Sequence, residues 1–342
     1  MHKAGKQHLE GKRIVITGAS MGIGQAVAIK LTEEGASVVV NARGMEKLQE
    51  TVDKIQAIGG KVVASCGSVA DFDYAGELIQ TCIDSFGGID VLINCAGISE
   101  PHGSCILDIP PEDWQNLIDI HLNGTFNTCR HASPIMAAQK HGSIINTGSH
   151  AFLGMYGGTG YAAGKGATVS LSHAMAMDLK EHGINVNVIC PGARTRLSTG
   201  EDYEALIKNL NQRGLLSDDM KEASLSPPEP AYVAPLYAWL ASDVAGKITG
   251  RTFWAAGGYI GQFHRNADQL LAFKHHDFQP PWELDEISHK LPLATLEKPD
   301  ELYNIIAAFS ALKILVKQSL LVRIGNSRPV KALMDWQGRR GK

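Results

Sequence analysis

The 342-residue sequence lacks paired cysteines, long apolar runs and a strong excess of charge of either sign. Its six cysteines are scattered, with no CxxC pair and no zinc-ligand spacing, which predicts reduced thiols, a cytoplasmic location and no metal site. The formal charge of −3 gives no reason to expect nucleic acid or an anionic membrane as a partner. The longest apolar run, NIIAAFSALKILV, is about 13 residues long and contains Lys313, whereas a membrane span needs ~20. We therefore expect a soluble protein.

Apolar bursts alternate with amphipathic segments from residue 13 onward. RIVITGAS, SVVVNAR and INVNVICPG read as strands that are apolar throughout, and segments of helical periodicity lie between them. Strands of this kind suit a parallel sheet covered on both faces, so the predicted fold class is α/β with a doubly wound parallel sheet. Composition shifts divide the chain into an N-terminal arm (1–10), one main domain (11–262) with a polar, proline-containing insertion (about 195–230), and a C-terminal helical extension (263–342).

The segment TGASMGIG joins the first predicted strand to the first predicted helix. Gly18, Gly22 and Gly24 permit a tight turn and close approach of the backbone to a pyrophosphate. The N-terminus of the helix presents free N–H groups and a positive dipole end to the same phosphates. This placement predicts a dinucleotide site.

The end of the second predicted strand, VVVNAR, bears on which dinucleotide binds. Ala42 stands where NAD sites place an acid for the ribose hydroxyls, and Arg43 follows directly. A guanidinium can bind a 2′-phosphate bidentately, so this strand favours NADP(H) over NAD(H). Arg43 could equally be an exposed residue at a helix entry.

The stretch GYAAGK sets Tyr161 four residues before Lys165, which places both side chains on one helix face. With TGASMGIG, NCAG, GSHAFLGMYGGTGYAAGK and CPG in this order, residues of about 10–262 resemble the classical short-chain dehydrogenases/reductases. The resemblance implies a single-domain Rossmann fold, usually a homodimer or homotetramer, and a small-molecule carbonyl or alcohol substrate.

What the resemblance implies for catalysis falls on Ser149, Tyr161 and Lys165. Tyr161 would exchange a proton with the substrate oxygen, Ser149 would hydrogen-bond that oxygen, and Lys165 would bond the nicotinamide ribose. A neighbouring cation should lower the pKa of the phenol toward working pH. The implied cofactor contacts are Gly18, Ser20, Met21, Gly22, Ile23, Gly24, Arg43, Ser68, Val69, Asn94, Ala96, Gly97, Tyr161, Lys165, Pro191, Gly192 and Thr195.

Three positions depart from the family pattern. His121 replaces the asparagine that helps hold a proton-relaying water; a histidine could hold the same water and, unlike asparagine, can titrate. Met21 replaces a basic residue frequent in NADP-dependent members, which counts against NADP(H). Ser68, next to Val69, replaces an aspartate that commonly bonds adenine.

The insertion at 195–230 matches the variable substrate lid of the family. Its leucines, with Met155 and Tyr156, suggest an apolar pocket for a steroid-like or acyl-thioester substrate, although the same leucines could form the core of two lid helices. The predicted activity is NADP(H)-linked interconversion of a ketone and a secondary alcohol. The alternatives are an NAD(H)-dependent hydroxyacyl-CoA or hydroxysteroid dehydrogenase, and a catalytically silent dinucleotide sensor or assembly protein.

Overall fold

A computed structural model describes residues 7–101, 103–154, 156, 158–264, 280–283 and 285–287. The chain divides into two units, one ending at His264 and the other beginning at Arg265. In the second unit, residues 285–287 form a single helical turn, in which the Ile287 N–H donates to the Glu283 carbonyl. Most of the expected C-terminal extension, much of the N-terminal arm, and Met155 lie outside the described residues.

An eight-stranded sheet in the order β3-β2-β1-β4-β5-β6-β7-β8 forms the centre of the first unit. The first seven strands are parallel, as predicted, and β8 is antiparallel to β7. The strands are β1 (Arg13–Thr17), β2 (Ser37–Ala42), β3 (Lys61–Cys66), β4 (Val91–Asn94), β5 (Gly142–Thr147), β6 (Ile184–Gly192), β7 (Thr252–Ala256) and β8 (Tyr259–Phe263).

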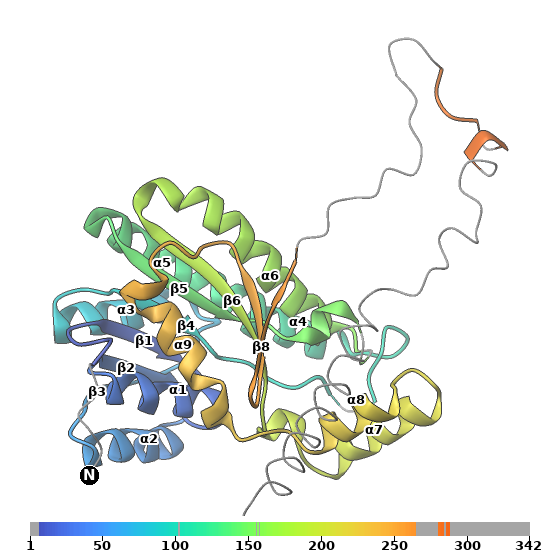
Figure 1. Ribbon diagram of the computed structural model, residues 1–342, viewed down its shortest axis with the longest axis horizontal. Helices are drawn as coiled ribbons and strands as arrows, with labels where there is room; N and C mark the ends of the chain where they lie inside the picture. Colours follow the sequence, from blue (N-terminus) through green and yellow to red (C-terminus); the bar gives the residue numbers. More distant parts are fainter. Residues whose placement is uncertain are drawn as a thin grey trace, which may run out of the picture. The chain divides into compact units, whose positions relative to one another are not determined.

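Helices cover both faces of this sheet (Figure 1). They are α1 (Gly22–Glu33), α2 (Met45–Ala57), α3 (Phe72–Phe86), α4 (Pro111–Ile118), α5 (Gly124–Gln139), α6 (Gly160–Asp178), α7 (Glu201–Gln212), α8 (Asp218–Leu225) and α9 (Ala234–Ala241). The fold class is therefore the predicted doubly wound Rossmann arrangement.

Alternate residues of each central strand enter two different cores. Ile14 and Ile16 of β1 pack in one cluster with Leu31 of α1 and Tyr237 of α9. Val15, between them, packs in the other cluster with Leu78 of α3. Burial on both faces explains why these strands are apolar throughout rather than alternating.

The sequence analysis did not identify the edge strand β8, although it ended the main domain at residue 262, within this strand. Gly257, at φ +55°, supplies the left-handed residue that a tight hairpin requires. The outer strand alternates between half-buried and exposed residues, with Ile260 exposed. An alternating pattern this short does not predict a strand by itself, because the strand forms by pairing with β7.

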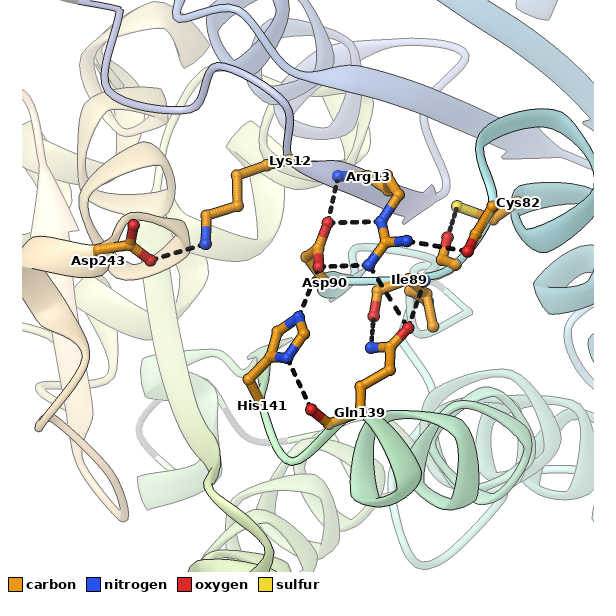
Figure 2. A network of polar contacts seen from close by, with 10 residues as sticks. Lys12, Arg13, Cys82, Ile89, Asp90, Gln139, His141 and Asp243 are labelled. Atoms are coloured by element: carbon orange, nitrogen blue, oxygen red, sulfur yellow. Dashed lines mark hydrogen bonds and ion pairs between the residues drawn. The ribbon is translucent and has the colours of Figure 1, made fainter.

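At the amino-terminal edge of the sheet, a polar network ties strand starts together (Figure 2). The Asp90 carboxylate accepts bonds of 2.8 Å from the backbone N–H, Nε and Nη2 of Arg13, and it lies 2.8 Å from Nε2 of His141. Nearby, Gln139 exchanges side-chain bonds with both backbone groups of Ile89. The starts of β1, β4 and β5 are thereby linked to the end of α5.

Candidate active site

The carboxyl ends of β1 and β4 meet where the strand order reverses, which is the usual ligand site of such sheets. Gly18 and Gly22 in the β1–α1 turn have φ of +65° and +57°, values that L side chains rarely adopt. A Cβ on Gly18 would lie 2.7 Å from Cα of Ala96, so only glycine allows the turn to pack on the β4 end. A Cβ on Gly24 would meet the Gly18 carbonyl oxygen.

The N-terminus of α1 has no side-chain cap. Its first turn therefore presents backbone N–H groups to a ligand. Thr195 lies across from it, because a Cβ on Gly22 would come 3.3 Å from the Thr195 methyl. The other predicted contacts at the turn and at the end of β6 are partly exposed along the same edge: Ser20, Met21, Ile23, Pro191 and Gly192.

Hydrogen bonds from β1, β5 and α5 hold the end of β4 in place. Thr17 Oγ accepts bonds of 3.1 Å from the N–H groups of Cys95 and Ala96. The buried Asn94 amide donates to Asn146, and its oxygen accepts from Thr128. Both functions of the Asn94 side chain are thus used internally, so this residue shapes the turn.

At the adenosine side, Arg43 is exposed directly after β2. Among the described residues, its guanidinium has no ion-pair partner, and its carbonyl accepts from the Cys66 thiol. Ser68 Oγ accepts a 3.4 Å bond from the Ala70 N–H, while Val69 is buried. The cation that the sequence singled out is therefore exposed at the carboxyl end of β2.

Ser149, Tyr161 and Lys165 come together from two segments of the chain. Ser149 follows β5 and accepts a 3.2 Å bond from the Ala151 N–H, and its hydroxyl lies near enough to that of Tyr161 to act on the pKa of the phenol. Lys165 Nζ lies 5.9 Å from the centre of the Tyr161 ring. One turn of α6 therefore holds phenol and ammonium together, as their spacing predicted.

The expected lowering of the Tyr161 pKa is wrong for the protein alone. Burial raises the pKa of this phenol, and Ser149 only partly opposes the rise. Tyr161 is consequently a protonated acid at neutral pH.

Lys165 is buried at 5% exposure and donates a 2.8 Å bond to the Thr147 carbonyl. Removal from water lowers the pKa of its ammonium to about 8. The thiols of Cys95 and Cys190 lie close enough to act on it in the opposite direction. Sequence analysis missed Thr147 and both cysteines here, since no spacing links them to Lys165.

His121 lies in a π-helical turn, Asp119–Asn123, between α4 and α5. Such turns occur mostly as single insertions at functional sites. Nε2 bonds the Ile98 carbonyl at 3.0 Å, and Nδ1 is buried without a hydrogen-bond partner. A Cβ on Gly97 would lie 3.0 Å from Cε1 of this ring and 3.8 Å from Nζ of Lys165.

The expectation that His121 could titrate in the working range is wrong. Burial, and secondarily the charge of Lys165, hold the pKa of the imidazole well below its usual value. The ring is therefore neutral at physiological pH, as an asparagine would be. It also packs edge-on to Tyr161, with ring centres 5.0 Å apart.

Glu100 is a further residue that sequence analysis missed. Its carboxylate accepts bonds from the first N–H groups of α6, those of Thr159, Gly160 and Tyr161. A carboxylate at a helix N-terminus satisfies unpaired donors and complements the dipole. Glu100 thereby fixes the start of the helix that carries Tyr161, from 61 residues away in the chain.

These features fit a nicotinamide dinucleotide. The glycine turn and the uncapped N-terminus of α1 suit the phosphates of a dinucleotide, and Thr195 lies beside Gly22 of this turn. Gly97 leaves space next to Lys165, and His121 offers an unused ring nitrogen there.

In the described part of the chain, no group of three or more His, Cys, Asp or Glu could bind a metal ion. None of the helices described there combines the length and apolar character that a bilayer span requires.

Comparison with known proteins agrees with this geometry. The short chain dehydrogenase family model matches residues 12–202. A 3-oxoacyl-[acyl-carrier-protein] reductase of Staphylococcus aureus is 34% identical over 257 residues, covering 72% of this chain and 97% of that protein. The (2S)-[(R)-hydroxy(phenyl)methyl]succinyl-CoA dehydrogenase subunit BbsD of Thauera aromatica is 31% identical, covering 73% and 97%.

Solved structures give the same result. A short chain dehydrogenase from Mycobacterium avium superimposes with a TM-score of 0.70 at 31% identity, covering 85% of this chain and 97% of that one. A dehydrogenase/reductase from Sinorhizobium meliloti has a TM-score of 0.62 at 29% identity, covering 74% and 96%.

Proposed function

Because this chain belongs to the short-chain dehydrogenase family and is an oxidoreductase, we propose that it reduces a ketone to a secondary alcohol with NADPH. The observation that carries the proposal is Tyr161, a protonated phenol near Ser149 and beside the buried Lys165. Reduction is the favoured direction because a phenol that stays protonated at neutral pH has a proton available for a developing alkoxide, which is a far stronger base.

Each side chain has a separate task in this reaction. A reduced nicotinamide dinucleotide, when bound, would supply the hydride that the carbonyl carbon accepts. Tyr161 gives its phenolic proton to the carbonyl oxygen, and Ser149 hydrogen-bonds that oxygen. Lys165, held by the Thr147 carbonyl, keeps a positive charge beside the phenol and binds the nicotinamide ribose. The neutral His121 orients a water molecule through Nδ1, the unused nitrogen.

For the substrate, we favour an acyl thioester that carries a keto group. The names of both relatives describe acyl groups on a carrier, acyl carrier protein in one and coenzyme A in the other. A steroid-like ketone is the second candidate, because Leu206 and Leu215 of the lid are 36% and 51% exposed and could cover an apolar ring system. A homodimer or homotetramer remains the proposed assembly.

The test is a ketone panel assayed by NADPH absorbance with wild type and Tyr161→Phe. Removing the acid should lower kcat by roughly 10³-fold while NADPH binding is unchanged. Equal turnover by both proteins would contradict the role of Tyr161. NADPH binding without turnover by wild type would instead identify a silent dinucleotide sensor.

The choice of cofactor is tested at Arg43. Arg43→Ala should raise KM for NADPH about tenfold or more and leave KM for NADH unchanged, because a charge-assisted bond to the 2′-phosphate is lost. Lys47→Ala, another exposed cation a few residues along, is the matched control. A preference of the wild type for NADH would instead favour the alternative of an NAD(H)-dependent enzyme, which is consistent with Met21 in place of a basic residue.

A further inference from the structure

Four polar side chains, two from the loop after β5 and two from the lid helices, form a cluster near Tyr161. His150 Nε2 lies 2.9 Å from Tyr156 Oη, which lies 3.4 Å from Ser224 Oγ of α8. Tyr203 of α7 lies near the same serine, which acts on the pKa of its phenol. The cluster therefore joins the loop after β5 to both lid helices.

The cluster holds more donors than internal contacts. Three hydroxyls and one ring N–H provide four donor hydrogens, and three contacts link the four side chains. One donor is left over in every arrangement. If the ring proton of His150 is on Nε2, the ring donates to Tyr156, each hydroxyl can donate to the next group, and one hydroxyl hydrogen is left unused; we call this the outward arrangement. In the other tautomer, the proton is on the buried Nδ1 and has no acceptor. Since buried unpaired N–H groups are rare, the outward arrangement is favoured.

The cluster also carries no charge at neutral pH. Burial lowers the pKa of His150 to about 4 and raises that of Tyr203 to about 12. Tyr156 and Tyr161 are both near enough to Tyr203 to add to that rise. A neutral donor beside the proton-donating phenol suits an uncharged oxygen acceptor better than a carboxylate or phosphate, which would need a cation.

The lid leucines are less available than the sequence suggested. Ile207, Leu210 and Leu216 are buried against the lid's own helices, at 0%, 5% and 4% exposure. Leu206 and Leu215 remain 36% and 51% exposed, so the lid offers some apolar surface in addition to the hydroxyl groups of the cluster.

We infer that Tyr156, Tyr203 and Ser224 form a second binding subsite, which hydrogen-bonds an uncharged carbonyl oxygen of the substrate separate from the ketone being reduced. This inference rests on the proposed function and narrows its substrate to dicarbonyl compounds such as β-keto thioesters. His150 is a positioning residue, because it acts only through Tyr156.

Two matched ketones test the subsite. One is the N-acetylcysteamine thioester of 3-oxobutanoate, and the other is the thioether in which a methylene replaces the thioester carbonyl. Wild type should favour the thioester in kcat/KM. Tyr156→Phe and Tyr203→Phe should each lower kcat/KM for the thioester about tenfold and leave the thioether unchanged, since one hydrogen bond is lost. Tyr232→Phe, on a 61% exposed ring, is the matched control.

The outcomes separate the two proposals. Equal losses on both ketones, no loss on either, or no preference of wild type for the thioester would overturn the subsite and leave the reductase function standing. No turnover of any ketone with NADPH or NADH would overturn the function itself. Ser224→Ala repeats the test if a tyrosine variant fails to fold.

Discussion

The amino-terminal ends of the parallel strands (the amino edge) and their carboxyl-terminal ends (the carboxyl edge) use similar residue types in opposite ways. At the amino edge, Asp90 is surrounded by donors, and both ring nitrogens of His141 face oxygen atoms, those of Asp90 and Gln139. At the carboxyl edge, no carboxylate of the described residues pairs with the buried Lys165, and one ring nitrogen of His121 has no partner among them. Complete pairing stabilises a fold, whereas unused polar groups are available for a ligand.

The pKa values express the same difference. Bonds from Arg13 and His141 outweigh burial and hold the pKa of Asp90 down at about 2. At the other edge burial dominates, lowering the pKa of Lys165 to about 8 and raising that of Tyr161. Lys165 is therefore able to lose its proton just above neutral pH, whereas Tyr161 stays protonated and Asp90 stays ionised there.

The largest effect is expected at Lys165. Lys165→Met should lower kcat by at least about 10²-fold, because the charge beside Tyr161 and the ribose contact are both lost. In wild type, kcat/KM for ketone reduction should fall as pH rises through about 8, where the ammonium loses its proton. Steady-state rates between pH 6 and 10 measure this, and a flat alkaline profile would contradict it.

At the amino edge, the expected effect is on stability alone. Asp90→Asn should cost about 2–3 kcal/mol of unfolding free energy at pH 7, because a mostly buried ion pair loses its anion, and kcat should be unchanged. Asp243→Asn is the matched control, since its bond to Lys12 involves an 88% exposed carboxylate and should be worth less than ~1 kcal/mol (Figure 2). Urea unfolding measures both.

The acid limb of stability gives a second readout of the same site. The folded pKa of Asp90, about 2, is below its unfolded value of ~3.9, so its contribution is present above the unfolded value and is lost as pH falls toward 2. That contribution is ~2.6 kcal/mol, since one pKa unit corresponds to about 1.4 kcal/mol, and Asp90→Asn should remove this part of the pH dependence. An unchanged acid limb would show that other groups control it.

The smallest effects distinguish the two histidines. His121→Ala should lower kcat about tenfold without adding a step in the pH profile between 5 and 8, because the wild-type ring is neutral there. His121→Asn should recover most of the rate. His141→Ala should leave kcat alone and lower the unfolding free energy by about 1 kcal/mol. Reversed results for the two positions would invalidate the contrast between the edges.

Sequence patterns succeeded where a local rule applies. Apolar strands with intervening helices predicted the parallel sheet, and the motifs around Tyr161 identified the family; both are confirmed. The patterns failed where the decisive partner is distant in the chain. β8 needs β7 beside it, and Glu100 and Thr147 act on α6 through contacts that no spacing encodes. The roles of the candidate site residues themselves remain predictions.

By itself, the sequence determined the layered architecture, the glycine turn and the helical pairing of Tyr161 with Lys165, because periodicity and backbone freedom are properties of neighbouring residues. Only the tertiary structure decided the protonation of Tyr161, Lys165 and His121 and the hydroxyl cluster under the lid. Desolvation and hydrogen bonding set those properties, and both depend on which distant segments exclude water from a group and which supply its partners.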